Sequence, residues 1–182
     1  MRWVPFLILV ALAALLQRTA GLVLTFSLPG VGSVGPDLLA AVAVFVACRS
    51  RAWEDAVLAA WVLGLAVDVT AGGAGVAVGP MSVAYALAAW VLFRIREAFF
   101  HERAVTQALL ALIFCLLAHG TWVTAETLLG GTGMAWADYG STMLQAVLLA
   151  VYTAALTPLV HAGLWRCRRL ILAAPTARGA RR

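Results

Sequence analysis

The stretch that decides the fold is residues 104–129, AVTQALLALIFCLLAHGTWVTAETLL, which contains one acidic residue and no Arg or Lys. It lies in the longest gap between Arg residues, which runs from Arg103 to Arg166. Two more apolar gaps separate the other Arg clusters: Arg18 to Arg49 and Arg51 to Arg94. Only 12% of the chain is charged and 64% is hydrophobic, whereas about a quarter of the residues in soluble domains are charged. The sequence therefore predicts an all-α integral membrane protein.

A membrane crossing needs roughly 20 mostly apolar residues. The 182 residues leave room for five or six crossings and for no attached soluble domain. We expect one transmembrane domain over residues 1–172 and a basic cytoplasmic tail over residues 173–182. Pro158 should kink the last span near Ala154, because its ring removes a helical hydrogen bond. The expected spans are residues 3–24, 37–48, 56–69, 80–93, 104–129 and 141–165.

The span at residues 37–48 is short enough to be a re-entrant segment, and the Arg positions decide between the two interpretations. With six crossings and the N-terminus inside, 12 of the 13 Arg fall on the cytoplasmic side and only Arg18 falls outside, in agreement with the positive-inside rule. If residues 37–48 did not cross, the loop from Arg94 to Arg103 would lie on the wrong side. We therefore expect a six-transmembrane-helix bundle with both termini in the cytoplasm.

Three residues of the third span share one helical face, because Ala60, Gly64 and Asp68 are spaced four apart. A charge near the centre of a span costs about 2.5–3.5 kcal/mol on insertion scales, so an acidic residue there needs a partner. Small residues let a neighbouring helix approach closely and cover the carboxylate. The spacing therefore predicts a packing face.

Other ionisable residues of the expected spans form a second group of candidates. His119 and Glu126 are seven residues apart and share a face of the fifth span. Arg18 is the one cation expected on the outer side, so it is the natural partner for Asp68, Glu126 or Asp37. We interpret these side chains first as ties between helices or as interfacial residues. A ligand or proton path and a contact with a partner protein are the alternatives.

The end of the last span is strongly basic, with Arg166, Arg168 and Arg169 close together. Basic residues just inside a span attract anionic lipids by about 1 kcal/mol each. We therefore expect these residues to be lipid-headgroup anchors and not a nucleic-acid site. The sequence contains no motif for nucleophilic, metal or nucleotide chemistry, so we expect neither an enzyme nor a cofactor.

Three stretches in a fixed order are more specific than hydropathy. Residues 36–39 (PDLL) open the second span, residues 64–68 (GLAVD) precede a Gly-rich loop, and residues 81–87 (MSVAYAL) follow it. With the Arg-rich end, this order resembles the rod shape-determining protein family MreD. The positions that match the family pattern are Pro36, Asp37, Gly64 and Asp68, and with Ala60 we expect them to form a packing or partner interface.

The resemblance implies a non-enzymatic component of the cell-elongation (rod) complex in the bacterial cytoplasmic (inner) membrane. Such a protein binds MreC, is linked through it to MreB filaments and elongation-specific peptidoglycan synthases, and helps to position peptidoglycan synthesis for cell-shape maintenance. The family fold resembles that of the substrate-binding S-components of energy-coupling-factor vitamin transporters. The alternative function is therefore a vitamin-binding S-component, with an outer pocket lined by the Gly-rich loop, Asp68, Trp122 and Glu126.

Overall fold

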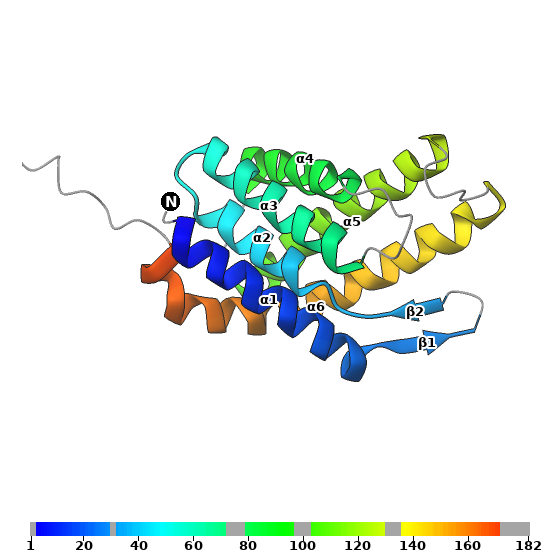
Figure 1. Cartoon of the computed structure of the whole chain (residues 1–182), viewed down its shortest axis with the longest axis horizontal. Helices are drawn as coiled ribbons and strands as arrows, with labels where there is room; N and C mark the ends of the chain where they lie inside the picture. The colour runs from blue at the N-terminus through cyan, green and yellow to red at the C-terminus, as the bar shows by residue number, and fades with distance from the viewer. Residues whose placement is uncertain (1–2, 30–31, 72–78, 97–102, 130–135, 172–182) are drawn as a thin grey trace, which may run out of the picture.

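The computed structural model describes residues 3–29, 32–71, 79–96, 103–129 and 136–171. Within them it is mostly helical, with six α-helices and one small antiparallel hairpin (Figure 1). The elements are α1 (Trp3–Leu24), β1 (Phe26–Leu28), β2 (Gly32–Val34), α2 (Leu38–Arg49), α3 (Trp53–Ala71), α4 (Pro80–Ile95), α5 (Ala104–Leu129), the 3-10 turn η2 (Trp136–Asp138) and α6 (Tyr139–Ile171).

The six predicted helices are present, and α1 and α5 have the predicted bounds. The prediction of an all-α fold is wrong at the hairpin, where Phe26 pairs with Val34 and Leu28 with Gly32. Pro29 and the glycines that follow it are typical of a turn, so the sequence predicts no strand there. Two three-residue strands around such a turn are too short to show a period of two. Gly32 has a φ of 98°, which L side chains rarely adopt and glycine tolerates.

Helix α2 is the centre of the bundle and contacts α1, α3, α4, α5 and α6. Ten consecutive residues, Leu39–Cys48, are buried. With 12 residues α2 is only about 18 Å long. Figure 1 shows that α1 and α6 continue past the start of α2 toward the hairpin. The N-terminus of α2 therefore lies among other helices, where non-helical backbone needs protein partners for its polar groups.

The two ends of the bundle differ in charge. We call the end at which α2, α4 and α6 finish the arginine-rich end. There the Arg96 guanidinium reaches the carbonyl oxygen of Ala47, and the Arg49 guanidinium lies 4.3 Å from the ring centre of Trp165. The start of α1 lies at the same end, and the hairpin marks the opposite one (Figure 1).

The interior combines many alanines with a few large side chains, and many large apolar side chains lie on the outside. Ala40, Ala59 and Ala111 are buried, but Val23 and Leu159 are 81% and 71% exposed. Water-soluble proteins usually bury such large aliphatic residues. Two helical segments, Ala104–Leu128 and Tyr139–Arg166, are long and apolar enough to cross a membrane.

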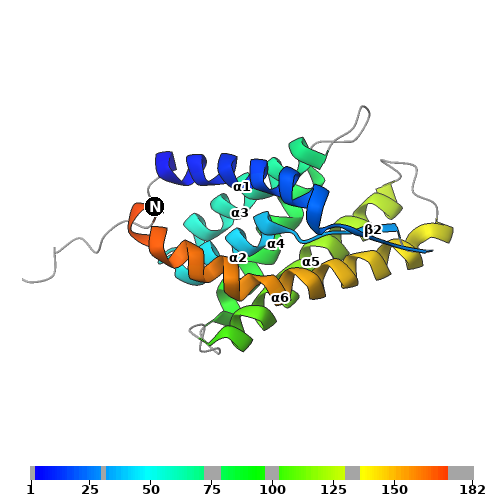
Figure 2. The same ribbon diagram turned by 90° about the horizontal axis from the view of Figure 1, so that it is seen from below.

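Helix α6 runs through Pro158 as one helix of 33 residues. The predicted kink near Ala154 therefore does not divide it into two elements. Figure 2 shows α6 as a continuous, curved helix. Directly before Pro158, the Thr157 hydroxyl donates to the carbonyl oxygen of Thr153, one turn earlier, at 2.8 Å.

Candidate functional site

Asp37 caps the N-terminus of the central helix. Its Oδ1 atom accepts a hydrogen bond from the backbone N–H of Ala40 at 3.0 Å, which is the usual contact of an N-cap carboxylate. Asp37 is only 3% exposed, so water does not compete for this contact. The cap therefore operates inside the bundle, where an unpaired N–H group is expensive.

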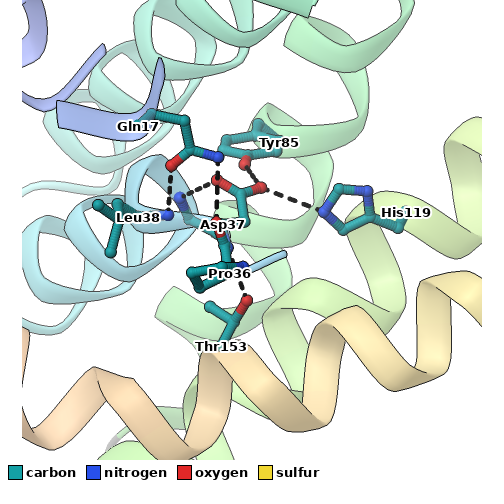
Figure 3. Close-up of polar contacts among 8 residues, drawn as sticks. Gln17, Pro36, Asp37, Leu38, Tyr85, His119 and Thr153 are labelled. Carbon is teal, nitrogen blue, oxygen red and sulfur yellow. Dashed lines mark hydrogen bonds and ion pairs between the residues drawn. The ribbon is translucent and has the colours of Figure 1, made fainter. Parts of the chain in front are cut away.

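Side chains from α1 and α6 satisfy the backbone just before and at the start of α2. Gln17 bridges it, because its Oε1 accepts from the N–H of Leu38 at 2.6 Å and its Nε2 donates to the carbonyl oxygen of Pro36 at 3.2 Å. From the other side, the Asp37 N–H donates to the Thr153 hydroxyl at 2.9 Å (Figure 3). These contacts fasten the entry to α2 to two neighbouring helices.

The second carboxylate oxygen of Asp37 is held by α4 and α5. The Tyr85 hydroxyl donates to Oδ2, and the Nε2 atom of His119 lies 3.1 Å from the same oxygen (Figure 3). We call Gln17, Asp37, Tyr85, His119 and Thr153 the Asp37 hub. It joins five of the six helices: α1, α2, α4, α5 and α6.

The chemistry of the Asp37 hub is hydrogen bonding between helices. Tyr85 is fully buried and its ring packs edge-to-face on Phe114, with centroids 5.1 Å apart. Asp37 and His119 are also buried, so a ligand would have to separate helices to reach the carboxylate. Within the described part of the chain, no three His, Cys, Asp or Glu side chains are grouped closely enough to share a metal ion.

At Gly64 the backbones of α3 and α4 approach each other closely. A Cβ atom at this position would lie 2.5 Å from Ser82 Cα and 2.7 Å from the Met81 carbonyl oxygen. Both atoms belong to the backbone of the first turn of α4, so no side-chain movement could make room. Ala60 lies one turn earlier on α3 and is also buried.

Asp68 caps the N-terminus of α4 from outside that helix. Its Oδ2 accepts from the N–H groups of Gly79 and Ser82 at 3.0 and 3.1 Å, and its Oδ1 accepts from the N–H of Met81 at 3.3 Å. Backbone N–H groups at a helix start carry partial positive charge, which favours a carboxylate there. The neighbouring helix that covers Asp68 is therefore α4, and it covers the carboxylate with its amides.

The predicted pairing of Arg18 is not found among the described residues. Arg18 is exposed, and no ion pair joins it to Asp37, Asp68 or Glu126 in the part of the chain described. The reason is that both aspartates already have partners: backbone amides at the starts of α2 and α4, with Tyr85 in addition at Asp37.

Glu126 lies apart from the Asp37 hub, two turns beyond His119 on α5. It is 4% exposed, and its Oε2 atom has no hydrogen-bond partner among the residues that the structure describes. Trp122, which precedes it by one turn, is partly buried against the core. The shared face of His119 and Glu126 thus points inward, but only His119 takes part in the hub.

At the arginine-rich end, Arg96 supplies a hydrogen-bond donor to the C-terminus of α2. Its Nη1 atom donates to the carbonyl oxygens of Ala47, Cys48 and Ser50 at 2.9, 3.3 and 2.5 Å. The last carbonyls of a helix lack helical partners, so a cation is favourable there. The predicted headgroup anchors are further along: Arg166 is exposed, and the side chains of Arg168 and Arg169 lie outside the described residues.

No protein-family model, curated protein or solved structure matches this chain. The site therefore has to be understood from its own geometry. Sequence reasoning placed Asp37 and His119 among the candidates but gave no role to Gln17, Tyr85 or Thr153. A polar residue in the middle of an apolar span, as at Gln17 and Thr153, was the signal that could have identified two of them.

We expect the substitution Asp37→Asn to destabilise the bundle. It leaves an oxygen to cap Ala40 but replaces the acceptor of Tyr85 and His119 with an NH2 donor. The free energy of unfolding in detergent micelles should fall by about 1–3 kcal/mol for each buried group left unpaired. Asp138→Asn is the matched control, because Asp138 is exposed. Equal stability of the two variants would contradict a structural role for the Asp37 hub.

We expect Gly64→Ala to separate α3 from α4, because the new methyl group would meet fixed backbone atoms. Overpacking of this kind costs about 1–3 kcal/mol, which thermal or denaturant unfolding in micelles would detect. The matched control is Gly120→Ala in α5, where a Cβ atom meets nothing within 4 Å. That variant should gain up to about 1 kcal/mol from helix propensity. Similar effects at both sites would argue against the close contact.

We expect Arg96→Gln to loosen the end of α2, because three carbonyl oxygens lose a charged donor. A hydrogen bond to a charged group contributes about 1.5–3 kcal/mol. Arg94→Gln is the control, since Arg94 is exposed and stacks 5.5 Å from the ring centre of Trp90. Unfolding midpoints that fall equally in both variants would show that loss of charge alone is responsible.

Proposed function

We propose that this chain is a multi-pass, non-enzymatic component of the bacterial cell-elongation complex, similar to MreD, which binds MreC in the inner membrane. One observation carries the proposal: the three stretches behind the resemblance touch one another. Gly64 and Asp68 contact Ser82, and Asp37 contacts Tyr85. Residues 36–39, 64–68 and 81–87 thus form one packed unit, although they are far apart in sequence.

The distribution of apolar and basic side chains supports a membrane location for all six helices. Large apolar residues are exposed along α1, α3, α4, α5 and α6, and α2 is enclosed by the others. Arg side chains cluster at the arginine-rich end, which by the positive-inside rule is the cytoplasmic end. A short central helix is compatible with this location, because its ends meet protein groups and not lipid.

The interior supports a scaffold in preference to a vitamin-binding subunit. A transport subunit would need Asp68 to face a substrate, but its two oxygens are occupied by the amides of α4. The Asp37 hub is likewise closed by its own hydrogen bonds. Binding partners would then contact the outer, apolar surfaces of the bundle. The packed interior would hold the helices that form these surfaces at fixed distances from one another.

The test is purification of the tagged chain from its native membranes in mild detergent, with partners identified by mass spectrometry. We expect MreC and elongation-specific peptidoglycan synthases to be recovered. Gly64→Ala should lower their recovery, and Gly120→Ala should not, because only the first disturbs the contact between α3 and α4. Recovery of a transmembrane coupling subunit with two ATPases would overturn the proposal and favour the vitamin-transport alternative.

A further inference from the structure

A cavity of about 360 Å³ opens at the arginine-rich end between α2, α5 and α6. Figure 2 shows the beginning of α5 and the end of α6 diverging at this end of the bundle. Cavities that hold small molecules usually measure roughly 300–1,000 Å³, so this one has room for a small polar group. Its lining includes Phe45, Arg49, Gln107, Pro158, His161 and Trp165.

The lining combines one cation with an aromatic wall. The Arg49 guanidinium lies 4.3 Å from the ring centre of Trp165, an arrangement that holds the charge at the edge of the cavity. Gln107 adds an amide from α5, and Phe45 with Pro158 forms an apolar side. The described lining contains no Asp or Glu. The cavity therefore favours a ligand that has a negative group beside an apolar part.

The N-terminus of α5 strengthens the positive character of the cavity, and the position of His161 leaves its space open. Ala104, which lines it, is the first residue of α5, and the N-terminus of a helix carries partial positive charge. His161 does not close the space, because its Nε2 atom is held 3.0 Å from the carbonyl oxygen of Ala41 and its ring packs edge-on against Phe45. His161 and Phe45 are thus held in place in the wall of the cavity.

We propose that this cavity binds a phosphate-bearing anionic group, with Arg49 and Gln107 as its polar contacts and Trp165 and Phe45 beside its apolar part. Two sources carry this chemistry: the headgroup of an anionic phospholipid and free phosphate. The combination of charge and apolar wall favours the phospholipid. This proposal rests on the proposed membrane location but not on binding to MreC. Its test can therefore fail or succeed independently of the test for MreC.

The test uses the full chain in mild detergent with equal amounts of phosphatidylglycerol and phosphatidylcholine, and native mass spectrometry counts the retained lipids. We expect the wild type to retain phosphatidylglycerol preferentially and Arg49→Gln to reduce that preference about tenfold, the usual effect of losing one charge-assisted hydrogen bond. Gln107→Leu should weaken retention without changing the net charge. Arg51→Gln is the matched control, because Arg51 is exposed and outside the cavity.

A second measurement separates the two sources and checks folding. In one outcome, inorganic phosphate raises the unfolding temperature of the wild type but not of Arg49→Gln while neither lipid is retained selectively. That result would support the site and identify free phosphate as its ligand. Circular dichroism of each variant without lipid checks that the helices remain. Equal retention of the two lipids by the wild type together with no effect of phosphate would overturn the proposal, and so would an equal loss in Arg49→Gln and Arg51→Gln.

Discussion

The structure depends on how the backbone at the start of α2 finds hydrogen-bond partners inside the bundle. Each polar group buried without a partner costs about 1–3 kcal/mol, and Asp37 at this position is only 3% exposed. Gln17, Thr153 and the carboxylate of Asp37 supply partners for the N–H groups of residues 37, 38 and 40. Gln17 and Thr153 thereby connect the start of α2 to α1 and α6. The other carboxylate oxygen of Asp37 contacts Tyr85 and His119, which connects it to α4 and α5 as well.

The same principle explains why the two buried aspartates need no arginine. Asp37 and Asp68 each lie at a helix N-terminus, where several N–H groups converge and carry partial positive charge. A sequence displays the charges of side chains but not the positions of these backbone dipoles. The expectation that Arg18 pairs with an aspartate was wrong for this reason. At the other end of α2, where the last carbonyl groups lack helical partners, a side-chain cation is favourable, and Arg96 provides it.

The sequence was most informative where a single residue has a local effect. Arg2 and Arg103 directly precede the starts of α1 and α5, and Pro80 marks the start of α4. The spacing of Gly64 and Asp68 indicated a packing face but could not name α4 as the neighbour. Gln17 and Tyr85 were missed because their contacts join residues 19 to 48 positions apart. The periodicity of a sequence predicts which residues share a face of one helix, but not which residues of different helices touch. The hairpin was missed because its strands are too short.

The positions of the polar contacts suggest how a rigid interior and an adaptable surface coexist in this bundle. Hydrogen bonds between membrane helices contribute only about 1–2 kcal/mol each, so no single one would hold six helices. Here several act on the same short helix: the Asp37 hub at its start and Arg96 at its end. Loss of the contacts at either end would remove polar ties between α2 and its neighbours. Under the proposed membrane location, the large apolar side chains on the outside would contact lipid and partner helices, and they could vary without disturbing the interior.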